Sequence, residues 1–578
     1  MTRHDLVRIL DEIALMLEMK GENPFKAKAY EHAARMIETL EDDPDDLVAT
    51  GKLASIKGIG EALNKKITEL VTTGHLPYYE DLKASIPPGH FEMLKIPGLG
   101  PRKIIALYNN LGIETIGELE YACLENRLVD LKGFGKKTQD NILNGIVHVK
   151  RYKDKRLFAD VIPVAEAIVR SLSNHDAVRN ISLAGSLRRG NEVVKDIDIL
   201  AASDNPLGLA DTFVALPDVE SIIAKGDTKV SVILSSGTNS DLRIVSPEEF
   251  PYALHHFTGS REHNTAMRGR AKKMGMKMNE YGLFSEAGFI ACDSEQAIFR
   301  ALGLDYIPPE LRENMGEIEA AENHTLPDLL KLGDIRGVFH IHTQYSDGAE
   351  TLDSIVREAK NMGYEYIGIS DHSRSAAYAG GLSVDDIKRQ HAQIDALNEK
   401  VAPFRIFKGI ESDIQPGGAL DYDEETLSTF DFVIAAVHSN FAMTEAAMTE
   451  RIMTALSHPY TTMLAHPTGR LLLAREPYSV NMQRIIDHAA AMEKIIELNA
   501  NPLRLDLDWR LIIQAKKKGV KIAINPDIHQ LNGFKHMAIG VQIARKGWLS
   551  PDDCINCLTV RQIDSLMKEH RQPGAADR

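Results

Sequence analysis

The spacing of hydrophobic and polar positions changes character along the 578 residues of the chain. Residues 1–152 repeat apolar positions with the period of an amphipathic helix, beginning with MTRHDLVRILDEIALMLEMKG. From about residue 153 to 250, short apolar runs such as Ile181–Leu183 alternate with helical segments, which predicts an α/β unit. After an acidic segment with several prolines at 308–334, strand-like runs and helical segments alternate again. The pattern predicts helical domains first, followed by two α/β units.

Three turns in the helical part share one glycine pattern. Their sequences are Ile56-Lys-Gly-Ile-Gly60, Ile96-Pro-Gly-Leu-Gly100 and Leu131-Lys-Gly-Phe-Gly135. Two glycines one residue apart allow a tight turn between two helices and leave backbone N–H groups exposed at the start of the second helix, where phosphate can bind. Lys103 and the pair Lys136–Lys137 add positive charge beside two of the turns. We expect contact with a nucleic-acid backbone without base readout, and a purely structural repeat is the alternative.

The first α/β unit contains three carboxylates that could share metal ions. Asp196 and Asp198 are two residues apart in an apolar run, so on a strand both side chains point to one face. Asp241 begins a further predicted strand. Three carboxylates on adjacent strands can hold two divalent ions about 3.5–4 Å apart, which activates a hydroxyl for attack and stabilises a pyrophosphate leaving group.

The turn before these carboxylates, Ala184-Gly-Ser-Leu-Arg-Arg-Gly190, carries donors for phosphate. Gly185 and Ser186 can offer a backbone N–H and a hydroxyl, and Arg189 can offer a bidentate guanidinium. A D-x-D pair alone is common by chance, whereas this turn six residues before a D-x-D pair is a specific pattern. It favours transfer of a nucleotide.

In the last part of the chain, strand-like runs repeatedly end in a residue that could bind a metal ion. The runs end at His340, His372, Glu411, His438, His466, Asn499 and His529. His342 shares a strand face with His340, and Asp347 follows in a turn. Polar residues at the carboxyl ends of alternating strands predict a barrel with its site at that face. Imidazole and carboxylate ligands suit Zn, Mn or Fe, and clustered ions would promote hydrolysis of phosphate esters.

Composition limits the possible partners and compartment. The formal net charge of −15 has the wrong sign for a nucleic-acid binder, so such a surface has to be a local patch, such as the basic stretch 261–273. Four cysteines favour a reducing compartment over a disulfide framework, and we interpret Cys554 and Cys557 as structural rather than as a zinc or redox pair. No apolar run reaches the roughly 18–20 residues that span a bilayer. We expect a cytoplasmic protein that does not enter a membrane.

The helical part resembles known DNA repair domains. The three turns resemble helix-hairpin-helix motifs, and NPFKAKAYEHAARMI with IKGIGEALNKKI resembles the small N-terminal domain of family X DNA polymerases. The resemblance implies DNA contacts by Lys26, Tyr30, Gly58, Gly60, Gly98, Gly100, Lys103, Gly133 and Gly135. Lys66 matches the lysine that forms a Schiff base with an abasic sugar in the lyase members. Ala54 and Ala62 stand where those lyases carry lysines, so Lys66 either forms the Schiff base or only contacts DNA phosphates.

The middle of the chain resembles the palm and the following subdomain of the same family. The resemblance implies that Asp196 and Asp198 bind two metal ions and that Asp241 binds the catalytic ion and accepts the proton of the primer 3′-hydroxyl. It also implies nucleotide contacts by Gly185, Ser186, Arg189, Lys195, His256, Phe257, Gly259, Asn264 and Arg268. Lys195 replaces a glycine of the animal members, so a backbone contact there would be differently placed, although its ammonium could still reach a phosphate. His256 replaces a tyrosine, so sugar discrimination is expected to be weaker or differently built. A surface histidine is the alternative for His256.

The last part resembles the PHP (polymerase and histidinol phosphatase) family. The resemblance rests on H-x-H-T-x-x-S-D-G, S-D-H and a final D-x-H, and it implies a distorted seven-stranded β/α barrel that binds up to three metal ions. The nine ligand positions of that family match His340, His342, Asp347, His372, Glu411, His438, His466, Asp527 and His529. All nine can bind a metal, whereas PHP domains that have lost ligands act as scaffolds.

The order of these motifs resembles that of bacterial and archaeal family X DNA polymerases with a C-terminal PHP domain. It implies a helical lyase-like domain at 1–80, a helix-hairpin-helix domain at 81–152, an α/β nucleotidyltransferase palm at 153–250, a subdomain around the nascent base pair at 251–316, a linker at 317–334, a PHP barrel at 335–570 and a tail at 571–578.

The resemblance further implies a function. The chain is expected to fill short gaps in base excision repair, as a monomer, using gapped or nicked DNA and dNTPs. Mg²⁺ or Mn²⁺ would serve the palm, and Mn²⁺, Zn²⁺ or Fe²⁺ the PHP cluster. The PHP domain is expected to be a 3′–5′ exonuclease, with AP endonuclease or 3′-phosphatase as further activities. Two alternatives stay open: a PHP domain that is a metal-stabilised scaffold, and a DNA end-binding adaptor without catalysis.

Overall fold

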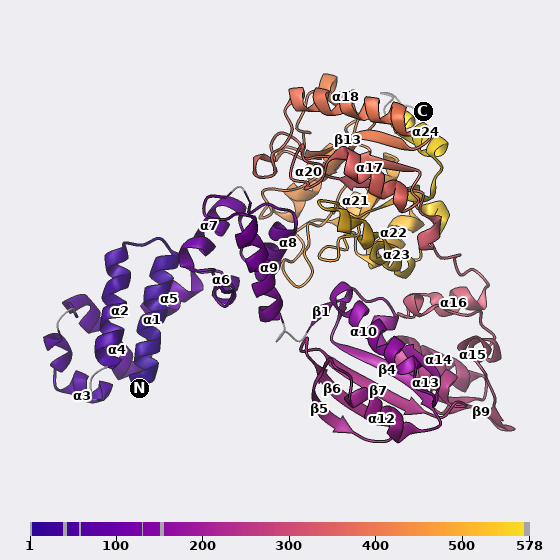
Figure 1. Ribbon diagram of the computed structural model, residues 1–578, viewed down its shortest axis with the longest axis horizontal. Helices are drawn as coiled ribbons and strands as arrows, with labels where there is room; N and C mark the ends of the chain where they lie inside the picture. Colours follow the sequence, from indigo (N-terminus) through magenta and orange to yellow (C-terminus); the bar gives the residue numbers. More distant parts are fainter. Residues whose placement is uncertain (1–2, 39–42, 57–58, 130, 151–154, 571–578) are drawn as a thin grey trace. The chain divides into compact units, whose positions relative to one another are not determined.

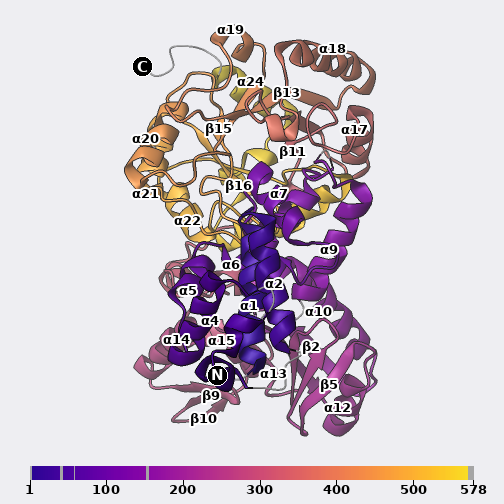
Figure 2. The same cartoon turned by 90° about the vertical axis from the view of Figure 1, so that its left-hand side faces the viewer.

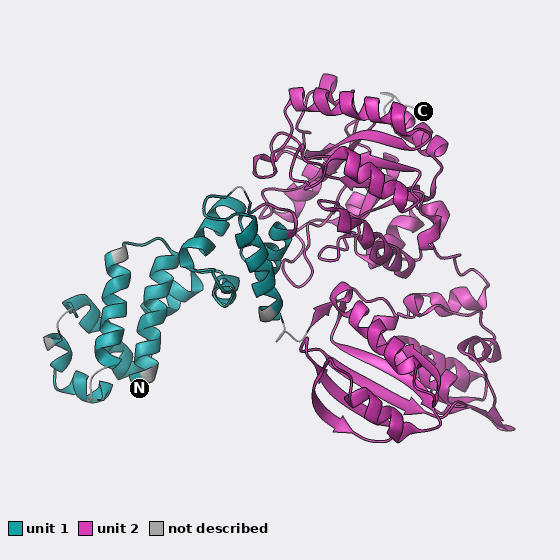
Figure 3. Ribbon diagram, in the orientation of Figure 1, with its two compact units in different colours: residues 1–123, 128–150 teal, residues 124–127, 151–578 magenta. Residues whose placement is uncertain are grey.

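The computed structural model describes residues 3–38, 43–56, 59–129, 131–150 and 155–570, which form two units. One unit contains residues 1–123 and 128–150, and the other contains 124–127 and 151–578 (Figure 3). In the described residues, no helix is both long and apolar enough to cross a membrane. All four cysteines are free thiols.

The first unit is built from helices, as the amphipathic pattern predicts. Its elements are α1 Arg3–Met19, α2 Pro24–Glu38, α3 Pro44–Ala49, η1 Lys52–Ser55, α4 Glu61–Thr73, α5 Pro77–Ala84, α6 Pro88–Met93, α7 Pro101–Leu111, α8 Ile116–Leu124 and α9 Lys136–Lys150. Their apolar faces share one core, to which Leu17, Ile67, Leu107 and Ile146 contribute fully buried side chains. The prediction of helical N-terminal domains is confirmed.

The glycine turns lie immediately before the helices that they were expected to introduce. Gly60 and Gly100 are the residues directly before α4 and α7, and each helix begins without a side-chain cap. Gly98 has a φ of 84° and Gly133 a φ of 89°, a region that L residues with side chains rarely adopt. The backbone therefore requires glycine at these two positions, and the uncapped starts of α4 and α7 leave their first N–H groups open to an anion. Gly58 lies outside the described residues.

The palm is a five-stranded mixed sheet within the described range 155–570. Its strand order is β2 Val178–Leu183, β4 Asp196–Ser203, β7 Asn239–Val245, β6 Lys229–Leu234 and β5 Val219–Lys225. Strands β4 and β7 are parallel, and the other neighbours are antiparallel. The helices α10 Phe158–Ser173 and α12 Pro206–Val214 pack apolar side chains against one face. The short elements β1 Arg156–Leu157, α11 Gly185–Arg188 and β3 Val193–Val194 complete this part.

The subdomain after the palm combines helices with a small antiparallel sheet. Its elements are α13 Phe250–Thr258, α14 Arg261–Lys273, β8 Lys277–Asn279, β9 Gly282–Ser285, β10 Gly288–Ile290, α15 Glu295–Ala301 and η2 Pro309–Leu311. The segment 308–334, whose prolines and acidic residues predict a linker, includes the ordered helix α16 Glu317–Glu322. Ile318 and Ala321 are buried in the subdomain core, and Glu317 lies 2.7 Å from Nδ1 of the buried His263. Composition alone predicted a linker, whereas tertiary contacts hold this short helix in the core of the subdomain.

The C-terminal part is a barrel of parallel strands surrounded by helices. Within 155–570, its seven strands run in chain order: β11 Gly337–Ile341, β12 Tyr366–Ile369, β13 Arg405–Asp413, β14 Phe432–Ala436, β15 Met463–Leu464, β16 Ile495–Asn499 and β17 Ile522–Asn525. A parallel bridge between Ile341 and Ile528 brings the first strand to the end of the last, so the barrel is nearly closed. The predicted distorted seven-stranded barrel is confirmed.

Helices follow most of the barrel strands and cover the outside of the barrel (Figures 1 and 2). They are α17 Leu352–Asn361, α18 Val384–Val401, α19 Glu424–Leu427, α20 Glu445–Leu456, α21 Met482–Ala491, α22 Trp509–Lys517, α23 His536–Lys546 and α24 Val560–His570. Short 3₁₀ turns accompany them: η3 Leu332–Asp334, η4 Ala377–Ala379, η5 Leu531–Lys535, η6 Pro551–Asp553 and η7 Ile555–Cys557. Strand β11 is buried along its whole length because helices cover the sheet.

Candidate catalytic and metal centres

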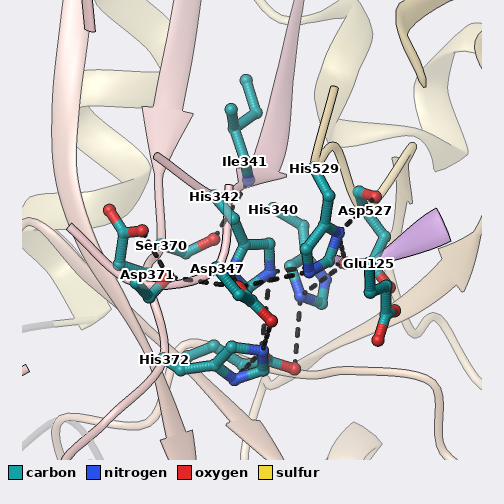
Figure 4. A network of polar contacts seen from close by, with 12 residues as sticks. Glu125, His340, Ile341, His342, Asp347, Ser370, Asp371, His372, Asp527 and His529 are labelled. Carbon is teal, nitrogen blue, oxygen red and sulfur yellow. Dashed lines mark hydrogen bonds and ion pairs between the residues drawn. The ribbon is translucent and has the colours of Figure 1, made fainter. Parts of the chain in front are cut away.

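The carboxyl ends of the barrel strands bring all nine predicted PHP ligands together. The ligand atoms form clusters whose members lie within 4.8 Å of one another: His342 with Asp347, His372 and His529; His340 with His466 and Asp527; His340 with His342 and Glu411; and His372 with Glu411 and His438. Figure 4 shows the imidazoles of His340, His342, His372 and His529 converging beside Asp347 and Asp527. Parallel strands end at the same rim of a barrel, which is why residues up to 189 positions apart can meet there.

Glu411, at the end of β13, is the common partner in this cage. Its Oε1 lies 2.9 Å from Nε2 of His466 and 3.2 Å from Nε2 of both His340 and His438. Its Oε2 lies 2.9 Å from Nδ1 of His372. A carboxylate that reaches imidazoles from four other strand ends would be a ligand to any metal ions that these imidazoles hold.

The donor set fits divalent cations. Both ring nitrogens of His342 are buried without a hydrogen bond, although Nε2 lies 3.3 Å from Oδ1 of Asp527 and Nδ1 lies 3.6 Å from Oδ1 of Asp347. Buried polar atoms without partners are rare in folded proteins, and metal ligation is a common reason for them. Nearby carboxylates outweigh burial and raise the pKa of four imidazoles of the cage, those of His340, His372, His438 and His529. Burial lowers the pKa of His342 to about 3 and that of His466 to about 4, which keeps these two imidazoles neutral. Neutral imidazole is the form that binds metal.

Three of the ligands have a backbone conformation that residues with side chains seldom adopt. The φ angles are 58° for His340, 25° for His466 and 53° for Asp527. Such conformations cost about 1–3 kcal/mol each and persist where the surrounding structure fixes them, often at functional sites. The fold therefore holds these side chains in the cage at a cost in stability, as is common at functional sites.

Carboxylates behind the cage orient the ligands, and the sequence pattern did not reveal them. Oε1 of Glu497, on β16, lies 2.6 Å from Nδ1 of His340, and its Oε2 accepts a hydrogen bond of 2.7 Å from the backbone N–H of His466. Asp413 contacts Nδ1 of His438 in the same way. Partners of this kind fix the tautomer and direction of a metal-binding imidazole. A strand buried on both faces gives no alternation from which the inward-facing Glu497 could be found.

A further carboxylate near the cage, Glu125, was also missed. Residues 124–127 belong to the same unit as the barrel, and an oxygen of Glu125 lies within 4.8 Å of ligand atoms of Asp527 and His529 (Figure 4). Arg127 pairs with Glu125, and its guanidinium lies 4.7 Å from the ring centre of Tyr378. No motif of the PHP pattern includes this position, so sequence offered no signal for it.

The palm places its three candidate carboxylates on one face of two neighbouring central strands. Asp198 of β4 is in register with Asp241 of β7, and Asp196 lies two residues earlier on the same face of β4. The neighbouring Ile197 and Ile199 point into the core, as the alternation predicts. Among the described residues, the groups of three or more ligand atoms within 4.8 Å of one another all lie at the ends of the barrel strands. The three palm carboxylates do not form such a group.

The palm carboxylates lie close enough to affect one another's ionisation. Burial, followed by the charges of Asp196 and Asp241, raises the pKa of Asp198 to about 6. Nζ of Lys229 lies 2.8 Å from Oδ2 of Asp241 and supplies a counter-charge. Clustered carboxylates whose ionised forms repel one another are suited to divalent cations, which remove that repulsion.

The predicted phosphate-binding turn lies directly beside these carboxylates. Gly185, with a φ of 60°, begins α11, and a Cβ at this position would lie 2.1 Å from Oδ2 of Asp198, so only glycine fits. Ser186 lies in α11, and Arg189 follows it. Lys195 is exposed one residue before β4. The turn and the carboxylates therefore form one candidate site.

The remaining nucleotide-contact candidates gather around the end of α13. Nδ2 of Asn264 donates a hydrogen bond of 2.7 Å to the backbone oxygen of His256, and Gly259 ends α13 with a φ of 72°. The Arg243 guanidinium lies 4.3 Å from the ring centre of Phe257. Arg268 lies on α14, where Nη2 is 3.5 Å from Oγ1 of Thr265. His256 is half-buried, and burial lowers its pKa, which keeps the imidazole neutral.

In the helical unit, Lys66 lies among aromatic side chains. Its Nζ donates a hydrogen bond of 3.0 Å to the hydroxyl of Tyr30 and lies 3.1 Å from the ring centre of Tyr78. Burial and the nearby charge of Lys26 lower the pKa of Lys66. Lys103 donates to the backbone oxygen of Gly98 and so lies beside its glycine turn.

Comparison with known proteins assigns the chain to a family. Family models match a helix-hairpin-helix domain at residues 1–76, a SAM-like helix-hairpin-helix tandem at 91–146, a DNA polymerase beta thumb at 253–313 and a PHP domain at 339–501. The DNA polymerase/3′-5′ exonuclease PolX of Bacillus subtilis (strain 168) is 38% identical over 574 residues, which cover 99% of this chain and 100% of that protein. The chain belongs to the PolX family of DNA polymerase/3′–5′ exonucleases.

Two more distant relatives each match one part of this PolX chain. DNA polymerase lambda of Rattus norvegicus is 23% identical over 339 residues, 53% of this chain and 55% of that protein. A probable phosphatase of Acetivibrio thermocellus is 28% identical over 199 residues, 33% of this chain and 78% of that protein. The predicted combination of a family X polymerase with a PHP domain is confirmed, and dependence on divalent metal ions follows from the two domains.

Proposed function

We propose that this PolX chain fills short gaps in DNA during base excision repair and that its PHP domain trims or cleans 3′ ends. The observation that carries the proposal is the presence, on one chain, of a palm carboxylate set and a cage of nine PHP ligands. The helix-hairpin-helix turns would hold the DNA backbone near nicked or gapped sites. We propose the domain division given above, a monomeric state and a cytoplasmic location, which the free thiols of all four cysteines support.

In the palm, we propose that Asp196, Asp198 and Asp241 hold Mg²⁺ or Mn²⁺. When bound, the ions would lower the charge on the triphosphate and favour ionisation of the primer 3′-hydroxyl. Asp241 would accept the proton of that hydroxyl as it attacks the α-phosphate. Ser186 and the guanidinium of Arg189 would bind the pyrophosphate that leaves.

In the PHP cage, we propose a cluster of up to three Mn²⁺, Zn²⁺ or Fe²⁺ ions held by the nine ligands. The ions would supply an activated water for hydrolysis of a phosphate ester. Glu497 and Asp413 keep the imidazoles of His340 and His438 in place. The relative named as a probable phosphatase supports phosphomonoester cleavage at a 3′ end as a second reaction of the same cage, and AP endonuclease action would use the same chemistry.

A single gapped substrate tests the proposal. With Mn²⁺ or Mg²⁺ and dNTPs, the purified protein is expected to extend the primer across a short gap, and without dNTPs it is expected to shorten the primer from its 3′ end. Denaturing gel electrophoresis of the labelled primer reports both. A protein that binds the DNA but leaves the primer unchanged would support the adaptor alternative and contradict the proposal.

We also propose that Lys66 has 5′-deoxyribose phosphate lyase activity. The observation that favours this over simple phosphate contact is the lowered pKa of Lys66, caused first by burial and then by Lys26, since a Schiff base needs a neutral amine. The hydroxyl of Tyr30, 3.0 Å from Nζ, holds the amine in place.

Lys66→Ala is expected to reduce the lyase product at least tenfold, because the amine that attacks the sugar is gone. The measurement is borohydride trapping of the protein on a DNA with an incised abasic site. Lys65→Ala is the matched control, since Lys65 is exposed on the same helix and pairs with Glu61. Equal trapping by the Lys66→Ala and wild-type proteins would limit Lys66 to DNA contact.

A further inference from the structure

Helix α23 of the PHP barrel lies against the polymerase part of the same unit. Ile539 packs against the palm core, and a Cβ placed on Gly190 of the palm would lie 2.6 Å from the side chain of Gln542. Nε of Arg545 donates a hydrogen bond of 2.7 Å to Glu310. The contact therefore reaches the last residue of the phosphate-binding turn.

Lys546, the last residue of α23, enters this contact almost completely buried, with 1% of the residue exposed. Its Nζ lies 2.5 Å from Oε1 of Glu313 and donates a hydrogen bond of 3.3 Å to the backbone oxygen of Arg189. It also lies 4.6 Å from the ring centre of Trp509. Burying an ammonium is costly unless it is paired, so this arrangement holds Glu313 and the Arg189 backbone firmly.

Glu313 contacts both Lys546 and the side chain of Arg189, and so connects the two residues. Nε of Arg189 donates a hydrogen bond of 3.0 Å to Oε1 of Glu313, the same oxygen that Lys546 contacts. Nη1 of Arg189 donates 2.6 Å to the backbone oxygen of Thr258. Although burial raises the pKa of Glu313, Lys546 and Arg189 lower it below the usual value, so the carboxylate is ionised at neutral pH. Two guanidinium nitrogens are thus fixed, and Nη2 forms no hydrogen bond to another described residue.

We propose that Lys546 of the PHP domain is a positioning residue of the polymerase site, acting through Glu313 to orient Arg189 toward the triphosphate of the incoming nucleotide. The inference rests on the proposed role of Arg189. It gives the PHP domain a part in nucleotide binding that is independent of its own metal cage. A fixed guanidinium binds phosphate without first losing side-chain freedom, so the restraint should improve dNTP affinity more than the rate of the chemical step.

Lys546→Met removes the ammonium and keeps the apolar stem. The expected result is a KM for dNTP that rises about tenfold, as expected for loss of a hydrogen bond to a charged group, with kcat changed less than twofold. Single-nucleotide gap filling by the full chain measures both constants, and 3′ trimming without dNTPs is expected to stay at the wild-type rate. Lys516→Met is the matched control, because Nζ of Lys516 pairs with Asp553 and Trp548 inside the PHP domain.

Glu313→Gln provides the second variant. It should raise the KM for dNTP as well, and the double variant with Lys546→Met should be no worse than the poorer single variant, because both act through Arg189. An unchanged KM in Lys546→Met would overturn the inference. Equal losses of extension and trimming together with a lower Tm would overturn it too, because they would indicate a structural role. A wild-type protein that does not fill gaps would instead refute the proposed function.

Discussion

Glu411→Gln is expected to remove the nuclease activity of this PolX chain while DNA synthesis continues. The carboxylate of Glu411 lies within 3.2 Å of ring nitrogens from His340, His438 and His466, so it would be a ligand to the ions that the cage holds. Carboxamide is a weaker ligand without charge, so the cluster would lose an ion or hold it loosely. Loss of an outer partner of a metal ligand already costs about 10–100-fold, so we expect at least a hundredfold fall in 3′ trimming.

The experiment compares trimming and extension on one gapped substrate, with metal content measured by mass spectrometry on the same preparation. Glu365→Gln is the control, because Glu365 forms an exposed pair with Arg336, and such pairs contribute little to stability. His342→Ala leaves Glu411 in place but removes another ligand of the cage. It should reduce 3′ trimming to the same extent if trimming depends on the cage and the variant is still folded. Trimming within tenfold of wild type in both cage variants would contradict the assignment.

The same measurements separate a nuclease from a metal-stabilised scaffold. If wild-type protein loses Tm in a chelator but never shortens a primer, the cage serves the fold alone. If trimming disappears in Glu411→Gln at an unchanged Tm, the cage is catalytic. The strained backbone at His340, His466 and Asp527 favours the second outcome, because a purely structural ion does not require three ligands with positive φ.

The cage could be predicted from sequence because its ligands come directly after apolar runs. In β11 and β14 every residue is buried, so each apolar run in the sequence is continuous and the residue at which it ends is easy to identify. His340 and His438 mark such ends, and parallel strands bring their ends to one rim. The D-x-D pair of the palm could also be predicted from the sequence. Asp196 and Asp198 alternate with Ile197 and Ile199, which places both carboxylates on one face of the strand.

Residues that support the sites were not predictable, because their role depends on contacts distant in sequence. Glu497 lies within an apolar run, where a single acidic residue has no pattern around it, yet it holds His340 157 positions earlier. Lys546 is 357 positions from Arg189, and nothing in their local sequences links them. Glu317 was assigned to a linker, although its burial against His263 makes it part of a core.

Asp241→Ala is expected to abolish primer extension while trimming by the PHP domain continues. Asp241 is in register with Asp198 and is the proposed acceptor of the proton from the primer 3′-hydroxyl. A general base alone contributes about 10²–10⁴-fold to a rate, and this variant also loses a metal ligand. We therefore expect extension to fall at least a thousandfold.

The loss should be in catalysis and not in DNA binding, because removing a carboxylate lowers the negative charge near the DNA. Asp241→Asn keeps the shape of the side chain and should be equally inactive, which separates loss of charge from loss of packing against Lys229. Asp204→Asn is the control, since Asp204 follows β4, the strand that carries Asp196 and Asp198, but pairs with Arg179 beyond the far end of that strand. Single-turnover extension with fluorescence anisotropy of labelled gapped DNA measures both steps. If Asp241→Asn extends primers within tenfold of wild type, another group accepts the proton and the palm assignment is wrong.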